Sequence, residues 1–505
     1  MMEMEMDPEC EELSGDLSCN QIEKQGRVLG GDAMSCLNLL ESMADENPRM
    51  FVRYLADKEG GLVNLFWSDT CSQLDYEIFG DVLAVDATYR KNKHMGPLVV
   101  FSGFNHHNQM IVFAAALVSN EKEETYVWLL QQLLDAMKGK APGSVITNGH
   151  RAMKNAIEVV FPLAYHRLCA WHLIENATSN LGNPTFTSEF KKCMLFDYEI
   201  SQFEDRWNKM VTELGLGDNQ WVCDLYACKK MWATAHIRRN FFGGFKATSR
   251  CEDLHSMLGK FVHCRHNLRD FVELFFQCLT QMRDREVQSD LCSVVGEVVL
   301  QSPLLSLENS AASLFTREIF YLFRPMLSRA CTLEVQACTY TPTSEIYTVS
   351  KSGISSKEWR VSHYPDESVF KCSCFRMEFL GVPCNHIVAV LDHLEFSELP
   401  RSLVLDRWTK EARMKFMGFM DEGPFSWDSV VTCRNLMLND LCREMCVLAS
   451  ATTRDFVDVS EKVWAEINRL KRKREAPEND YSDQNYEAAL SDFWQDSSFG
   501  DIWEE

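Results

Sequence analysis

The sequence lacks any apolar run long enough to span a membrane. Its longest run, residues 110–118, has nine residues, whereas a transmembrane helix needs about 20. The first residues, MMEMEMDPECEE, contain neither the positive flank nor the apolar stretch of a secretory signal. We therefore expect a soluble protein of a reducing compartment, without a membrane partner. In that setting the 20 cysteines predict buried thiols and a metal site, rather than a disulfide framework.

Basic residues are scarce at both ends of the chain. Residues 475–505 hold ten acidic residues and no base, and residues 1–33 hold nine acids and two bases, so most of the net charge of -22 lies there. This acidity argues against binding nucleic acid over the whole surface, but it does not exclude a local basic groove. Both ends are predicted to be disordered. The C-terminal tail also carries aromatic residues, and it suits an activation segment and a solubilising tail equally well.

Hydrophobic periodicity predicts a mixed α/β domain. Alternating or continuous apolar residues predict strands, and apolar residues three and four apart predict helices. We expect strands at 81–86, 97–103, 109–118, 144–147 and 163–169, helices at 121–137, 150–160 and from 171, and a hairpin tip at 105–108. The order is β-β-β-α-β-α-β-α. Residues 180–245 lack strand alternation and predict an inserted helical block, whereas residues 36–55 predict a helix before the first strand.

The most specific motif is CSCFRMEFLGVPCNH at residues 372–386. A CxC pair and a CxH pair supply three thiolates and one imidazole, which suits the closed tetrahedral site of structural zinc. We expect the two sulfurs of CxC to share one face of a strand, and Gly381 and Pro383 to turn the chain back. The pattern resembles the SWIM zinc finger. The predicted ligands of this single zinc are Cys372, Cys374, Cys384 and His386; a metal-free buried cluster is the less favoured alternative.

A second pair, Cys169 and His172, has half of a zinc-ligand set in LCAWH. At a junction between a strand and a helix, such a pair is more often part of the core than a metal site. We keep it as a second metal half-site, with core packing as the favoured interpretation.

Two of three positions match the pattern of a nuclease built on an RNase H-like core. In such enzymes, carboxylates from the first strand, the fourth strand and a later helix converge and bind two divalent ions. Asp86 lies at the first position and Glu252 suits the third. The second position reads VITNGH and holds Asn148.

These segments together resemble one family over residues 31–395. FGDVLAVDATYRKNKHMGPLVVFSGFNHHNQMIVFAAAL, VITNGHRAMKNAI, YHRLCAWHL and NFFGGFKATSRCE are similar to plant far-red-impaired-response regulators, which derive from Mutator-like transposases. The resemblance implies an RNase H-like (DDE transposase) mixed sheet with a helical insertion, then a small SWIM-type finger and a helical C-terminal region. The implied divisions are a head at 1–35, a helical lead-in at 36–80, the transposase-like domain at 81–275, a connector at 276–350, the finger at 351–395, a helical region at 396–474 and the tail at 475–505.

The sequence departs from that family at two places. Asn148 replaces an expected aspartate, so we expect no transposition; a histidine ligand for manganese at His150 is the minor alternative. Asp86 then suits a paired buried acid as well as it suits residual metal binding. Relatives commonly begin with a zinc-chelating DNA-binding domain, whereas residues 1–50 hold only Cys10, Cys19 and Cys36 and no histidine. We therefore expect this chain to lack that domain.

Basic residues cluster at four places. The first is Arg90, Lys91, Lys93 and His94, the second is His236, Arg238 and Arg239, and the third is Lys260, Arg265 and Arg269. If the fold brings the first and third beside Asp86, they could line a phosphate-binding groove; a solvated surface is the equal alternative. The fourth, RLKRKR, suits a nuclear import signal, although cations also favour a helix end. Its basic residues are Arg469, Lys471, Arg472, Lys473 and Arg474.

Three functions fit the sequence. The first is a zinc-binding nuclear regulator of transcription that contacts DNA through its transposase-like body, without catalysis. The second is an adaptor without DNA affinity that dimerises with full-length relatives. The third is an active transposase or nuclease, which Asn148 disfavours. The resemblance implies homo- or heterodimers, a nuclear location, a role in far-red light signalling and no small-molecule substrate.

Overall fold

The computed structural model describes residues 14–17, 31–47, 49–58, 60–88, 96–243, 267–296, 298–352, 354–413, 442, 445–446 and 448–475. Outside these residues lie Glu252, the whole first basic cluster, and Lys260 and Arg265 of the third cluster. The acidic tail also lies outside them, except for its first residue, Glu475. The chain divides into two compact units, Met1–Phe419 and Met420–Glu505. No helix among the described residues is long and apolar enough to cross a membrane.

The first unit is built on an eight-stranded mixed sheet with the order β1-β2-β3-β6-β5-β4-β7-β8. β4, β7 and β8 are parallel, and the other neighbours are antiparallel. The strands are β1 (Ser14–Leu17), β2 (Phe51–Ala56), β3 (Leu62–Ser68), β4 (Val82–Thr88), β5 (Leu98–Phe104), β6 (Met110–Leu117), β7 (Ser144–Thr147) and β8 (Tyr165–Leu168). The predicted β-β-β-α-β-α-β-α order is confirmed from β4 onward.

The predicted helical lead-in is wrong in part. Helix α1 (Gly31–Glu46) ends before the predicted boundary, and the chain then forms β2, β3 and helix α2 (Thr70–Phe79). The apolar residues of β3 pair with β6 in the middle of the sheet, and β2 pairs with β3. This tertiary pairing overrides the helical spacing that residues 51–55 show in isolation. Within the predicted disordered head, β1 pairs with β2.

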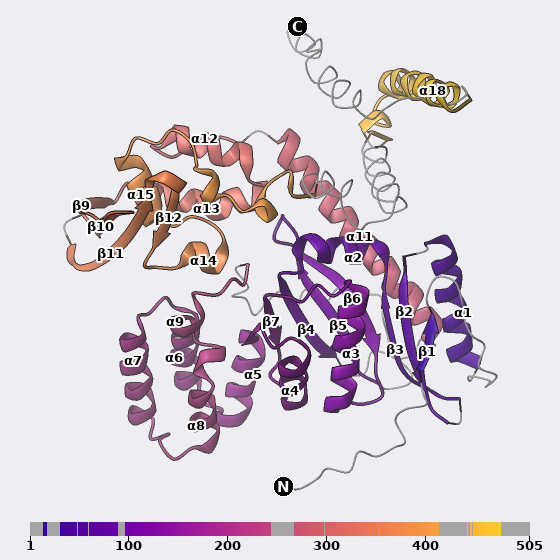
Figure 1. Ribbon diagram of the computed structural model, residues 1–505, viewed down its shortest axis with the longest axis horizontal. Coiled ribbons are helices and arrows are strands. Elements are labelled where there is room, and N and C mark those ends of the chain that lie inside the picture. Colours follow the sequence, from indigo (N-terminus) through magenta and orange to yellow (C-terminus); the bar gives the residue numbers. More distant parts are fainter. Residues whose placement is uncertain are drawn as a thin grey trace. The chain divides into compact units, whose positions relative to one another are not determined.

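Helices cover both faces of this sheet, as expected for an α/β architecture. On one face, α1 and α11 (Leu268–Val295) pack on Trp67, Val100 and their neighbours. On the other face, α2, α3 (Glu123–Ala136) and α4 (Arg151–Val160) bury Phe101 and Phe113. Figure 1 shows α3 and α4 lying across the strands. Alternate residues of each central strand therefore face two different cores.

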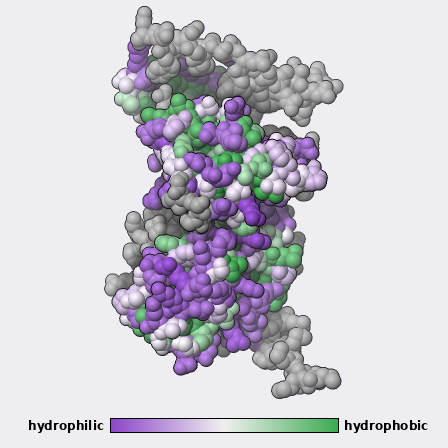
Figure 2. Space-filling view, turned by 90° about the vertical axis from the view of Figure 1, so that its left-hand side faces the viewer, coloured by the Kyte–Doolittle hydropathy of each residue, from purple (hydrophilic) through white to green (hydrophobic). Residues whose placement is uncertain are grey.

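The predicted helical block is confirmed. After α5 (Ala170–Leu181), which ends at Gly182 in the left-handed conformation (φ 58°), it comprises α6 (Pro184–Leu195), α7 (Ile200–Glu213), α8 (Gln220–Ala227), η2 (Lys229–Met231) and α9 (Thr234–Ile237). Its core is aromatic: Phe190, Phe203, Trp207 and Trp232 stack edge to face or tilted. The outer surface of this lobe is mostly hydrophilic (Figure 2), so the amphipathic helices bury their rings inward.

A second, antiparallel sheet has the order β12-β11-β10-β9. Its strands are β9 (Leu333–Tyr340), β10 (Glu345–Lys351), β11 (Ile354–Tyr364) and β12 (Val369–Cys372). The accompanying helices are α12 (Leu305–Leu314), α13 (Arg317–Ala330), η3 (Pro365–Glu367), α14 (Arg376–Leu380), α15 (Asn385–His393), η4 (Arg401–Leu403) and η5 (Asp406–Trp408). In the second unit, α18 (Thr453–Glu475) contains the whole basic run.

Candidate functional site

The four predicted zinc ligands converge. The sulfurs of Cys372, Cys374 and Cys384 and a ring nitrogen of His386 all lie within 4.8 Å of one another. Cys372 Sγ is 3.6 Å from His386 Nδ1. All four residues are buried. Three sulfurs and one imidazole at these separations match the donor set and size of a tetrahedral zinc site, with no position left open for substrate.

Three short elements place these ligands. Cys372 ends β12, and Cys384 is the N-cap residue of α15, where its sulfur accepts a hydrogen bond from Ile387 N at 3.4 Å. The expectation that CxC shares a strand face is wrong, because Cys374 lies beyond the end of β12. A turn closed by the hydrogen bond from Phe375 N to Cys372 O (3.0 Å) brings its sulfur back instead. Gly381 returns the chain, with a φ of 74° that favours glycine.

The surroundings of the cluster favour a bound cation. The ring of Trp359 stacks on that of His386 at 4.2 Å between centroids. Burial raises the pKa of the Cys384 thiol well above its usual value. Thiols in such a setting stay protonated unless a metal ion replaces their protons, which couples metal binding to local folding. The residues present therefore fit a structural zinc ion.

A second site forms at one end of β4 and β7. These strands are parallel, with Val85 opposite Thr147, so Asp86 and Asn148 follow at the same level of the sheet. Both line one pocket. Asp86 is buried and lies on the same strand face as Ala84, away from α3 and α4. The structure thus brings together the first and second positions of the predicted nuclease pattern, while Glu252 lies outside the described residues.

Asn148 and His150 form a turn just before α4. Asn148 Oδ1 accepts a hydrogen bond from His150 N at 3.0 Å, immediately before α4. The His150 side chain is exposed, and it is not among the residues that line the pocket. The pocket therefore contains the carboxamide, not the imidazole that would replace it as a manganese ligand.

The predicted half-site, Cys169 and His172, lies in this same pocket. His172 Nε2 is 3.7 Å from Asp86 Oδ1. Burial alone would lower the pKa of His172, but a hydrogen bond with Cys169 and the charge of Asp86 outweigh it and raise that pKa. Within the described residues these groups are not drawn together as closely as the four zinc ligands. The sequence did not indicate that His172 faces Asp86, because the two residues are 86 positions apart.

Comparisons with known proteins agree with these two sites. Residues 82–176 match the MULE transposase domain, and residues 371–395 match the SWIM zinc finger. The chain is similar to several proteins of Arabidopsis thaliana. It is 30% identical to FAR1-RELATED SEQUENCE 9 over 414 residues, which cover 81% of this chain and 74% of that protein.

The chain belongs to the FAR1-related family. It is also 30% identical to FAR1-RELATED SEQUENCE 5 over 77% of this chain, and 29% identical to FAR-RED IMPAIRED RESPONSE 1 over 85% of it. It spans about half the length of these two relatives, 50% and 52%. The SWIM match and the ligand cluster together assign one structural zinc site to Cys372, Cys374, Cys384 and His386.

In this FAR1-related chain, two described arginines of the basic clusters are paired with acids. Arg238 forms ion pairs with Asp197 (3.0 Å) and Glu199 (2.8 Å). Arg269 is paired with Glu273 at 3.0 Å. These pairs reduce the positive potential that Arg238 and Arg269 would offer to a phosphate. Whether the first and third clusters form a phosphate-binding groove stays a prediction.

Proposed function

We propose that this protein is a nuclear regulator of transcription whose transposase-derived body is kept for binding and does not cut DNA. The observation that carries the proposal is Asn148, which lies beside Asp86 where a second carboxylate is expected. A carboxamide offers one neutral oxygen. It lacks the charge that gathers two divalent ions for phosphoryl transfer.

Cleavage of supercoiled plasmid DNA in magnesium or manganese tests this proposal. We expect no metal-dependent nicking by the wild-type protein. Asn148→Asp restores a carboxylate and is the variant expected to gain activity, and Asp86→Asn in the same background is the matched control that should abolish it. Nicking by the wild-type protein that disappears in Asp86→Asn would contradict the proposal.

The family relationship and the basic run support a nuclear role. The names of the relatives associate them with the response to far-red light, and we assign the protein to the same kind of signalling. Lys471 and Arg472 are exposed at the end of α18. A fluorescent fusion should be nuclear, and Lys471→Gln with Arg472→Gln should shift it toward the cytoplasm. Lys462→Gln with Lys209→Gln is a control that removes two exposed cations elsewhere.

DNA contact is tested by duplex binding across a salt series. A regulator that contacts phosphates should bind alone, and its affinity should fall linearly with salt on a double-logarithmic plot. No binding at low salt, with or without a longer relative, would contradict the regulator. Binding only in a mixture with such a relative would favour the adaptor instead.

The adaptor is the second candidate, and α18 favours it. Val457, Trp464 and Ile467 are exposed on this helix. At 100° per residue they fall on one side, as in helices that pair through an apolar stripe. We expect Trp464→Glu to weaken self-association or pairing with a FAR1-related relative in sedimentation experiments. Ala465→Glu adds the same charge outside the stripe and should have little effect.

A further inference from the structure

The hairpin between β5 and β6 buries two consecutive histidines. Asn105 Oδ1 accepts hydrogen bonds from His107 N (3.0 Å) and Gln109 N (2.9 Å), and Asn108 adopts a left-handed conformation (φ 58°). This turn directs the imidazoles of His106 and His107 into the protein, where each residue is only 1% exposed. Burying two imidazoles at a hairpin tip is costly unless their nitrogens find partners.

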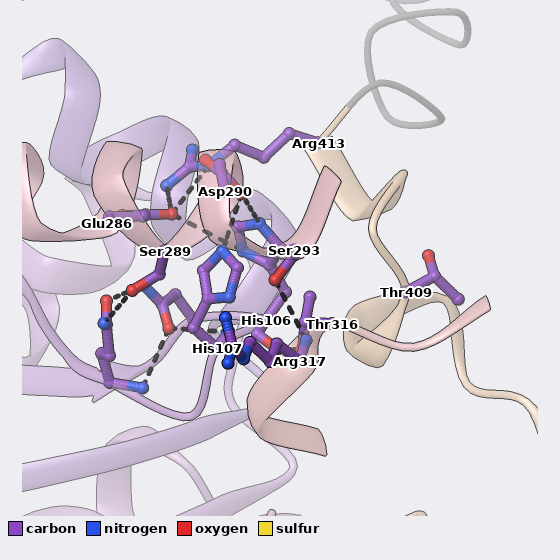
Figure 3. A network of polar contacts seen from close by, with 12 residues as sticks. His106, His107, Glu286, Ser289, Asp290, Ser293, Thr316, Arg317, Thr409 and Arg413 are labelled. Carbon is purple, nitrogen blue, oxygen red and sulfur yellow. Dashed lines mark hydrogen bonds and ion pairs between the residues drawn. The ribbon is translucent and has the colours of Figure 1, made fainter. Parts of the chain in front are cut away.

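Both imidazoles converge on one oxygen. His106 Nε2 and His107 Nε2 each lie 2.7 Å from Oδ1 of Asp290, which belongs to α11 (Figure 3). Their ring centroids are 4.1 Å apart. One ligand atom from each of the three residues lies within 4.8 Å of the others. Among the described residues, this is the only such compact group besides the SWIM zinc ligands.

The other edge of each ring faces a second carboxylate. His107 Nδ1 is 2.9 Å from Glu318 Oε2 on α13, and His106 Nδ1 is 3.6 Å from Glu286 Oε1 on α11. Histidines that bind zinc through one nitrogen commonly donate the other N–H to a carboxylate, which fixes the ring orientation. His107 has such a hydrogen-bonded carboxylate in Glu318, and His106 has Glu286 at ion-pair distance, so the carboxylate behind His107 matches the supporting residues of a metal site.

The carboxylates around the histidines are only partly balanced by arginine side chains. Arg413 forms ion pairs with Glu286 (Nε to Oε1, 2.9 Å) and with Asp75 (2.8 Å). Within the described part of the chain, the ion pairs of Asp290 and Glu318 involve only the two imidazoles. Burial would lower the pKa of His107, but the hydrogen bonds with Asp290 and Glu318 outweigh it and raise that pKa to about 9, so in the absence of a metal a proton on His107 balances part of this negative charge. A divalent ion would take the place of that proton. Asp290 is 40% exposed, which gives an ion a route of entry.

We propose that His106, His107 and Asp290 bind a divalent transition metal of the zinc type, separate from the SWIM zinc. Two imidazole nitrogens and a carboxylate oxygen are ligands that zinc accepts, with water completing a tetrahedron. The ion would hold the hairpin tip against α11. Thr316, next to α13, already donates a hydrogen bond to His106 O (2.7 Å), so the site would join the central sheet to two helices that follow it in the chain.

Metal content of the full chain, loaded with zinc and dialysed, tests the proposal. We expect two zinc equivalents per wild-type chain and one in His107→Gln. Cys384→Ser should also retain one, and the double variant close to none. His150→Gln changes an exposed histidine and should keep two. One equivalent in the wild-type protein, or no loss in His107→Gln, would overturn the second site.

Cobalt titration of the wild-type chain needs no variant and therefore does not depend on how well a variant folds. Cobalt in the SWIM zinc site, which has three thiolate ligands, should give sulfur-to-cobalt charge-transfer absorption. Cobalt in the second site should add d–d absorption without further charge-transfer intensity. Saturation of both bands together at one equivalent would rule the second site out.

Discussion

At position 148 the side chain is a carboxamide whose oxygen accepts the hydrogen bond from His150 N at the start of α4. An aspartate at the same position could accept the same bond, since Asn and Asp side chains both accept a hydrogen bond from the backbone two residues on. The local fold is therefore compatible with either residue, whereas the negative charge is present only with aspartate. Because the fold does not depend on that charge, Asn148→Asp should fold, and its activity tests the proposed lack of cleavage separately from stability.

For the zinc site, we expect Cys384→Ser to lower bound zinc by one equivalent per chain. The serine hydroxyl does not supply the thiolate that zinc requires, and the buried segment around α15 should lose its structure with the ion. Elemental analysis together with limited proteolysis measures both effects. Cys223→Ser is the control because Cys223 is exposed and distant from the ligand set; stoichiometric zinc in Cys384→Ser would contradict the assignment.

On the scale of elements, α2 begins with a buried charged cap. Asp69 accepts a hydrogen bond from Ser72 N (2.8 Å) and forms an ion pair with Arg283 of α11 (2.8 Å). Burial alone would raise the pKa of Asp69, but the charge of Arg283 and the hydrogen bonds from Ser72 outweigh it and lower that pKa. One side chain thus starts α2 and joins it to a helix about 200 residues later in the sequence.

Asp69→Asn should keep the cap but lose the ion pair, and it should lower the unfolding free energy by about 2 kcal/mol near neutral pH. Because the pKa of Asp69 is lower in the folded than in the unfolded protein, its ionised form stabilises the fold. This stabilisation is complete at pH values above the unfolded-state pKa of about 4, and it is lost as the pH falls through the folded-state pKa. The difference between wild-type and variant proteins in denaturant unfolding should therefore shrink below pH 4. Asp205→Asn, on the exposed side of α7, should change stability by less than about 0.5 kcal/mol at any pH.

Within the first unit as a whole, Arg407 links the segment after the finger to the central sheet. It pairs with Asp81 and donates from Nη2 to Phe104 O at 2.9 Å. The Arg407 side chain is 6% exposed. Arg401, six residues before Arg407, is paired with Asp406, and its side chain is 60% exposed. The two arginines differ mainly in burial, so they form a matched pair for measuring what burial contributes.

Arg407→Met should lower the unfolding free energy by about 3 kcal/mol, because it leaves buried or partly buried acceptors without a donor. Arg401→Met should lower it by no more than about 1 kcal/mol, since exposed ion pairs contribute little. Denaturant unfolding followed by tryptophan fluorescence measures both. Equal losses in the two variants would show that the buried link does not hold the finger segment to the sheet.

Local patterns predicted much of this molecule. The strands from β4 onward, the helical block and the zinc ligands are each set by residues close together in sequence, where periodicity and spacing carry the information. Residues 51–55 show where such patterns fail. Their apolar spacing suits a helix, but an unpaired edge of β3 was available, and pairing with it decided the outcome.

The sequence by itself determined the family, the three-thiolate and one-imidazole zinc set, and the carboxamide at position 148, because each is a matter of residue identity or short spacing. Only the tertiary structure decided that His172 faces Asp86 and that Asp290 meets the hairpin histidines across more than 180 residues. Such encounters depend on how strands and helices pack, and packing brings together side chains whose separation along the chain gives no sign of contact.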